Sequence, residues 1–105
     1  VLAAWETAGQ VQWTRLDPKG GAGELVVPGG TPNNRKHPSL AVNRDGNILL
    51  VWTEGTGWNK GGGLAWQQYD RRGQAVGERG SAPGIPTWGL AAAAARPDGS
   101  FAIIY

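Results

Sequence analysis

Two stretches of this chain follow one pattern, Asp45-Gly-Asn-Ile-Leu-Leu-Val-Trp52 and Asp98-Gly-Ser-Phe-Ala-Ile-Ile-Tyr105. Each starts with Asp-Gly, continues with an apolar run and ends on an aromatic residue, and the copies lie 53 residues apart. Asp-Gly between apolar runs is a strong hairpin signal, because glycine adopts a positive φ at little cost. The pattern therefore predicts β-hairpins that recur along the chain, with the apolar run as the second strand of each.

A second pair of stretches repeats at the same distance, Val11-Gln-Trp-Thr-Arg-Leu-Asp-Pro-Lys-Gly20 and Leu64-Ala-Trp-Gln-Gln-Tyr-Asp-Arg-Arg-Gly73. The matched residues are Trp13 with Trp66, Asp17 with Asp70, and Gly20 with Gly73. Side-chain character alternates with a period of two in both copies, which is typical of strands. The closing Asp-x-x-Gly predicts a four-residue turn.

Each repeating unit therefore contains four predicted strands. The first ends at Asp-Gly, as in Ser39–Val42, and the second is the apolar run, as in Ile48–Trp52. The third is the tryptophan-containing stretch, and the fourth is short and weakly apolar, as in Glu24–Val27. Val1-Leu-Ala-Ala-Trp5 has the character of another apolar run.

The alanine tract Ala91–Ala95 favours a helix by local propensity alone, because alanine is the best helix former. The repeat instead places this tract where Leu40–Val42 stands in the preceding unit, and Pro97 disfavours helix at Arg96. We therefore expect a strand, with small side chains because radially packed sheets crowd together near a shared axis.

Four strands per unit at this spacing are typical of a propeller blade. The predicted divisions are a partial blade over 1–36, a complete blade over 37–84 and the start of a third over 85–105. They would contribute three, four and two strands, and propellers have about four to eight blades. The chain is therefore expected to be a fragment of a longer β-propeller, in an all-β fold of antiparallel strands.

These residues resemble the sialidase-like, BNR-repeat β-propeller superfamily. The resemblance is carried by Ser39–Trp52, Leu64–Gly73 and Arg96–Tyr105. The family's Asp-box, Ser-x-Asp-x-Gly-x-Thr-Trp, is not present in full, because Asn43–Gly46 and Arg96–Gly99 lack its spacing and its Thr-Trp. The resemblance implies a six-bladed propeller and a secreted or periplasmic location.

Composition narrows the possible chemistry. The 105 residues include 18 Gly, 7 Pro and 6 Trp but no Cys, and no apolar run approaches the roughly 20 residues of a membrane-spanning helix. Without cysteine there is no disulfide framework and no thiol nucleophile. The formal net charge of +2 gives no reason to expect nucleic-acid binding. The basic doublets Arg71-Arg72 and Arg35-Lys36 are predicted to be solvated turn residues.

No complete catalytic set is predicted within the chain. The resemblance implies three arginines that clamp a carboxylate, a Tyr-Glu pair and an Asp. The arginines here are Arg15, Arg35, Arg44, Arg71, Arg72, Arg79 and Arg96, and none lies in an Arg-Ile-Pro motif. Among the acids, six repeat between units, which turn geometry explains better than a single active site. Glu6 and Glu54 follow apolar runs and are the better functional candidates, against the alternative of an exposed charge at a strand end.

His37 is the only histidine, and it lacks the His or Cys companions of a metal site. We therefore expect a loop residue before Pro38, and no metal or cofactor is predicted. The tryptophans Trp5, Trp13, Trp52 and Trp66 stand at repeated positions and are expected to pack between blades.

The stretch Glu54-Gly-Thr-Gly-Trp-Asn-Lys-Gly-Gly-Gly63 is the least repeat-like part of the chain. Its glycines are expected to leave the backbone free around Trp58, Asn59 and Lys60. An aromatic plane beside amide and ammonium donors is typical of sugar or peptide recognition. Trp88 lies on a predicted connection, where it is expected to be exposed, and it joins Trp58, Asn59 and Lys60 as a candidate binding residue. The alternative for the loop is a mobile segment in which Trp58 covers the blade edge.

Three functions are compatible with these observations. The first is a non-catalytic propeller segment that binds a glycan or protein partner. The second is part of a glycan-hydrolysing, sialidase-type propeller whose catalytic residues lie outside this chain. The third is a short-chain lectin in which several copies complete one ring. We expect the first, because the catalytic set is missing and a fold does not by itself imply an activity.

Overall fold

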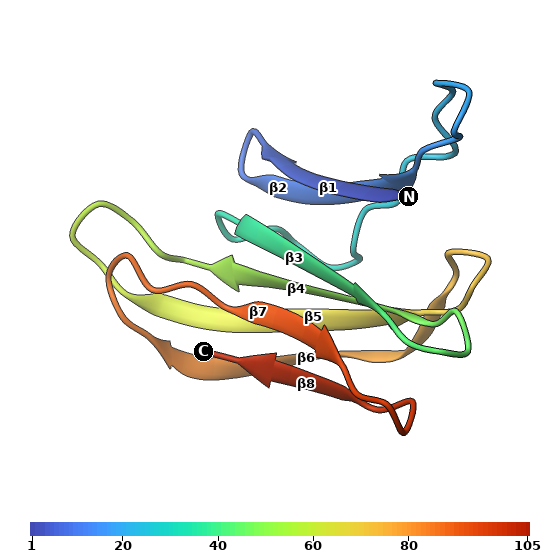
Figure 1. Cartoon of the computed structure of the whole chain (residues 1–105). Helices are drawn as coiled ribbons and strands as arrows, with labels where there is room; N and C mark the ends of the chain where they lie inside the picture. Colours follow the sequence, from blue (N-terminus) through green and yellow to red (C-terminus); the bar gives the residue numbers. More distant parts are fainter.

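The computed structural model describes residues 1–105 as eight β-strands without a helix (Figure 1). The strands are β1 (Leu2–Thr7), β2 (Gln10–Arg15), β3 (Lys36–Val42), β4 (Ile48–Glu54), β5 (Gly62–Tyr69), β6 (Ala75–Ile85), β7 (Ala92–Ala95) and β8 (Phe101–Ile104). They form three antiparallel sheets, β1-β2, β3-β4-β5-β6 and β7-β8. The predicted all-β class is confirmed. The structure has no helix with the length and apolar character needed to cross a membrane.

Strand β4 is buried on both of its faces. Ile48, Leu50 and Trp52 pack toward the β1-β2 hairpin, whereas Leu49 and Val51 pack toward the β7-β8 hairpin. Because side chains alternate along a strand, the continuous apolar run of β4 supplies a core to each side. The four-stranded sheet therefore lies between the two hairpins, and the three sheets follow one another in chain order (Figure 1).

The two interfaces between sheets are built from equivalent positions of the repeat. The following residues each face the next sheet along the chain: Leu2, Ala4, Val11 and Trp13 in the first interface, and Leu49, Val51, Leu64 and Trp66 in the second. The residues that receive them are also matched, Leu40, Ile48 and Leu50 in the first interface and Ala93, Phe101 and Ile103 in the second. The repeat in the sequence is therefore also a repeat in packing.

Four turns of one geometry join the strands at one end of the sheets. Each starts at a residue whose carbonyl accepts a hydrogen bond from the N–H of a positive-φ glycine three residues later, as from Gly46 to Asn43 (3.0 Å) and from Gly73 to Asp70 (2.9 Å). The Asp70 carboxylate also accepts hydrogen bonds from the N–H groups of Arg72 and Gln74. In the last turn, hydrogen bonds from the hydroxyl and N–H of Ser100 hold the pKa of Asp98 below its usual value. The predicted turns are confirmed. The carboxylates of Asp17, Asp70 and Asp98 accept hydrogen bonds from backbone N–H groups of their turns, and in the remaining turn the Asn43 side chain does so in place of Asp45.

The alanine tract forms strand β7, as the repeat predicts, and is not a helix. Ala93 faces the core between the second and third sheets, and its N–H donates a hydrogen bond to Ser39 Oγ in β3 (3.0 Å). Small side chains permit this close approach of β7 to β3. Tertiary packing thus overrides the local helix propensity of alanine.

The predicted fourth strand of the first unit is wrong as a full strand. Glu24–Val27 contributes only one bridge, in which Val26 exchanges two backbone hydrogen bonds with Trp13. The Thr14 hydroxyl instead contacts the carbonyls of Gly23 and Glu24, both at 3.0 Å, so a side chain replaces part of the ladder. The chain therefore has eight strands where nine were expected, and the four-stranded sheet extends from Lys36 to Ile85.

We predict that Leu50→Ala lowers the free energy of unfolding by about 2–5 kcal/mol, because it leaves a cavity at a fully buried position of β4. Leu25→Ala is the matched control, since Leu25 is largely exposed and should cost under about 1 kcal/mol. Urea unfolding of both variants provides the measurement. Equal losses would contradict a core centred on β4.

Tyr69 is a buried titratable residue at the end of β5. Its ring packs edge-on against Trp13, with centroids 5.3 Å apart, and its hydroxyl has no hydrogen-bond partner. Burial raises the pKa of Tyr69 to about 12, and Trp13 and the Arg35 guanidinium offset only part of that rise. The folded state therefore favours the neutral phenol.

The raised pKa of Tyr69 predicts a loss of stability in alkali. Its stabilising contribution is complete below the unfolded pKa of 10.0 and is lost as the pH rises toward about 12. Tyr69→Phe removes this contribution, so its unfolding free energy should fall less over the same interval. Urea unfolding of both proteins across this pH window tests the difference. Parallel curves would show that the hydroxyl does not titrate with folding.

Candidate functional site

The two ends of the stacked sheets differ in regularity. The four matched turns lie at one end, on the right of Figure 1, which we call the turn end. The other end, on the left of Figure 1, carries the β1-β2 turn and the connections 28–35, 55–61 and 86–91, and we call it the loop end. Connections on a rigid scaffold are where binding residues concentrate.

Every non-glycine residue with a positive φ lies at the loop end. These residues are Ala8 (50°), Asn34 (50°), His37 (52°) and Trp88 (65°). The value at Ala8 follows from its place in a two-residue hairpin turn, and asparagine tolerates this conformation well. Trp88 is a bulky residue that rarely adopts a positive φ, and the backbone of His37 is further restricted by Pro38, which follows it. Backbone strain of this kind clusters at functional sites.

Trp58 and Trp88 form an exposed aromatic pair at the loop end. Their ring centroids lie 5.2 Å apart at an interplanar angle of 78°, an edge-to-face contact. The side chains nonetheless remain 82% and 68% exposed. Two large apolar rings that contact each other and face solvent are the strongest single sign of a binding surface in this chain.

The loop that presents Trp58 is ordered by its own backbone. Gly57 and Lys60 pair in a small bridge, which places Trp58 and Asn59 at the tip of a tight turn. The expectation that the glycines leave the backbone free is wrong for the base of this loop. A Cβ on Gly62 would lie 2.2 Å from the Glu54 carbonyl oxygen, so the missing side chain permits close packing.

A pocket of about 200 Å³ opens beside the tryptophan pair. Besides the two rings, it is lined by Glu6 at the end of β1 and by Lys36 and His37 at the start of β3. The His37 N–H donates a hydrogen bond to Glu6 Oε2 (2.7 Å), and its Nδ1 lies 3.3 Å from Thr53 Oγ1. Residues from the first sheet, the second sheet and the connection to the third thus meet in one place.

Only part of the predicted site is assembled. Trp58 and Trp88 come together, whereas Asn59 and Lys60 are exposed on the loop and do not line the pocket. Glu6, one of the two acids predicted as functional candidates, lines the pocket. Lys36 and His37 also line the pocket, although the sequence does not predict either as a binding residue. His37 was expected in a loop, but it lies within β3 at a register shift between Lys36 and Ser39.

The prediction that Arg35 is a solvated turn residue is wrong, because its side chain is fully buried. Its Nε donates to Glu54 Oε1 (2.9 Å), Nη1 donates to the Gln10 side chain and the Pro28 carbonyl, and Nη2 donates to the Gly29 carbonyl. Its guanidinium also lies over the Trp52 ring, 5.4 Å from the centroid. Arg35 therefore ties the first sheet, the connection and β4 together.

Glu54 is the acidic partner in this network and not a free charge at a strand end. Its Oε1 accepts hydrogen bonds from Arg35 Nε and from Trp52 Nε1, each at 2.9 Å. Arg79 Nη1 lies 3.8 Å away. Glu54 thus fixes the end of β4 where the Trp58 loop begins, and Arg35 does the same for the start of β3, which carries Lys36 and His37.

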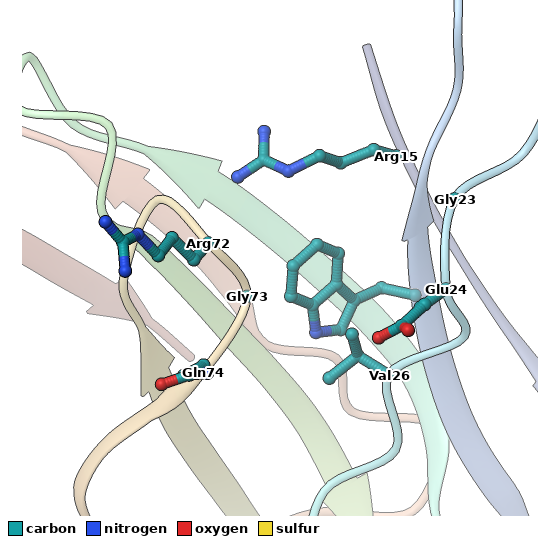
Figure 2. Close-up of a pocket in the computed structure, with 8 residues that line it drawn as sticks. Arg15, Gly23, Glu24, Val26, Arg72, Gly73 and Gln74 are labelled. Carbon is teal, nitrogen blue, oxygen red and sulfur yellow. The ribbon is translucent and has the colours of Figure 1, made fainter.

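A second cleft, of about 340 Å³, lies at the turn end (Figure 2). Trp13 is one of its lining residues. The Arg15 and Arg72 side chains reach toward it from two different segments of the chain (Figure 2). Arg15 donates a hydrogen bond to the Arg71 carbonyl, and Arg71 donates one to the Asp45 carbonyl (3.1 Å). These arginines connect neighbouring turns, so the cleft is explained by packing between units.

Comparison with known proteins adds no relative. No protein-family model, curated protein or solved structure matches this chain. A functional proposal for this chain therefore rests on the geometry of its own residues at the loop end.

We predict that Arg35→Met costs about 3 kcal/mol or more in unfolding free energy, because it removes the cation that pairs with Glu54 and the side-chain donor of the Pro28 carbonyl from a fully buried position. Arg72→Met is the control, since this exposed arginine donates no side-chain hydrogen bond, and its effect should stay within about 0.5 kcal/mol.

The double variant Arg35→Met/Glu54→Gln should recover part of the loss, because a neutral amide at position 54 no longer needs a cationic partner. Chemical denaturation of the single and double variants provides the measurement. Similar effects for Arg35→Met and Arg72→Met would contradict the clamp.

Proposed function

We propose that this chain is a segment of a β-propeller that acts as a non-catalytic binding module for a glycan or protein partner. Two features support the propeller. The four-stranded sheet has its strands in chain order, and successive sheets pack through equivalent positions. The sialidase-like resemblance adds six blades and a secreted or periplasmic location to the proposal.

The outer faces of the terminal sheets support further blades. Trp5 is 37% exposed, whereas Trp52 at the matched position of β4 is fully buried. Ile104 of β8 is likewise 64% exposed, although its counterpart Val51 is fully buried. Positions that form a core within the middle sheet are thus uncovered on the two hairpins, and a neighbouring sheet of the same kind would bury them.

The observation that carries the binding function is the contact between Trp58 and Trp88. The alternative, in which Trp58 covers the blade edge, is not supported by a side chain that is 82% exposed and touches another exposed ring. The backbone bridge behind Trp58 and the strained φ of Trp88 present both rings without much freedom. A rigid aromatic anchor is what a binding surface uses, since little conformational entropy is lost on contact.

The non-catalytic part of the proposal rests on how the charged groups at this end are used. Arg35 would be the natural carboxylate clamp, but its donors already bind Glu54, Gln10 and backbone carbonyls. Arg79 donates to the Gly29 carbonyl. Hydrolysis would therefore depend on residues outside this chain, and no observation here favours it.

We predict that Trp58→Ala and Trp88→Ala each abolish, or weaken about tenfold or more, the binding of ligands selected from glycan arrays and displayed-peptide libraries. Arg72→Ala, at the turn end, should leave that binding unchanged. Affinities are measured by titration calorimetry, and the ligand should be recovered chemically intact. Binding that survives both tryptophan substitutions but is lost in Arg72→Ala would place the site at the turn end and contradict the proposed site.

A further inference from the structure

The tryptophan pair forms a corner with two apolar walls. Because the rings meet edge to face at 78°, a ligand placed in the corner contacts one face of each. The face of an aromatic ring carries partial negative charge and attracts either cations or the weakly polarised C–H groups of a ring such as a sugar. The tryptophan pair alone therefore does not distinguish a cation from a sugar ring.

The charges of the remaining lining residues distinguish a charged ligand from an uncharged sugar ring. Glu6 contributes one negative charge to the pocket and Lys36 one positive charge, so the formal charges cancel. An anionic ligand would meet the Glu6 carboxylate, and a cationic one would meet the Lys36 ammonium. An uncharged ligand with hydroxyl groups satisfies both, since a hydroxyl donates to the carboxylate and accepts from the ammonium. The His37 imidazole and the Thr56 hydroxyl add further partners of either kind.

The size of the pocket limits the ligand further. Its volume of about 200 Å³ lies below the roughly 300–1,000 Å³ of pockets that enclose drug-sized molecules. The pocket therefore holds one ring, and the rest of a longer ligand would extend into solvent over the exposed Asn59 and Lys60 side chains.

We infer that the pocket formed by Trp58, Trp88, Glu6, Lys36 and His37 binds a single pyranose ring of a neutral glycan. The ring packs its C–H face against the tryptophan corner, and its hydroxyls pair with Glu6 and Lys36. The inference rests on the proposed binding function and narrows its ligand to one class. Because charge balance carries the argument, charged sugars and quaternary ammonium groups are excluded as preferred ligands.

The test uses the whole chain on an array of oligosaccharides printed in matched neutral and sialylated forms. Calorimetry then follows with the best neutral trisaccharide, and choline serves as a cationic probe. We expect binding to neutral glycans, weakened about tenfold or more by Trp58→Ala and by Trp88→Ala. Glu6→Gln and Lys36→Met should each weaken it by less, and in the same direction, because each removes one partner of an uncharged ligand.

Charged ligands would give opposite signs in the same pair of variants. Glu6→Gln would strengthen binding of an anion and Lys36→Met would strengthen binding of a cation. A preference for sialylated glycans, for choline or for a peptide that still depends on Trp58 and Trp88 overturns the neutral-sugar inference and leaves the proposed binding function standing. Binding that does not depend on either tryptophan, or no binding to any probe, overturns both.

Discussion

Burial of β4 on both faces is the constraint on which the rest of this structure depends. Its apolar side chains alternate between two cores, so both faces of the strand must be buried. One sheet cannot provide two cores by itself, and a hairpin must cover each side. The sheets therefore stack in a row. No sheet of this chain covers the outer faces of the two hairpins, and Trp5 and Ile104 therefore face solvent at positions that are buried one unit away.

Stacking also divides the molecule into two ends with different roles. The strands of successive sheets run in matched directions, so all four Asp/Asn/Arg-initiated turns collect at one end, whereas the connections 28–35, 55–61 and 86–91 lie at the other (Figure 1). The turn end repeats because every unit needs the same reversal of direction, and in each turn an Asp or Asn side chain accepts hydrogen bonds from backbone N–H groups. The loop end is free to vary because its connections only have to span the gap. A site unique to this chain is therefore expected among those connections.

The sequence was sufficient for features that depend on local pattern and repetition. The Asp-Gly turns, the apolar strand after each and the strand formed by the alanine tract all follow from matching one unit with the next. Trp58 and Trp88 were selected one by one as exposed aromatics, but their contact joins two connections of different sheets, and no local pattern predicts it. The burial of Arg35 is not predictable from local sequence for the same reason. A charged doublet is usually solvated, and its burial depends on Glu54, Gln10 and two carbonyls that converge only in the folded chain.

The buried Arg35 network also explains how a pocket can form on connections without becoming loose. Arg35 immediately precedes Lys36 and His37, and its N–H donates a hydrogen bond to the Gly9 carbonyl of the first hairpin (2.9 Å). The start of β3 is thus fixed to the first sheet. His37 then takes a strained φ while its N–H reaches Glu6 on that sheet, and Glu54 holds the beginning of the Trp58 loop on the other side. The Arg35 guanidinium that joins two sheets therefore also holds Lys36 and His37 in place relative to the tryptophan pair on the other side of the pocket.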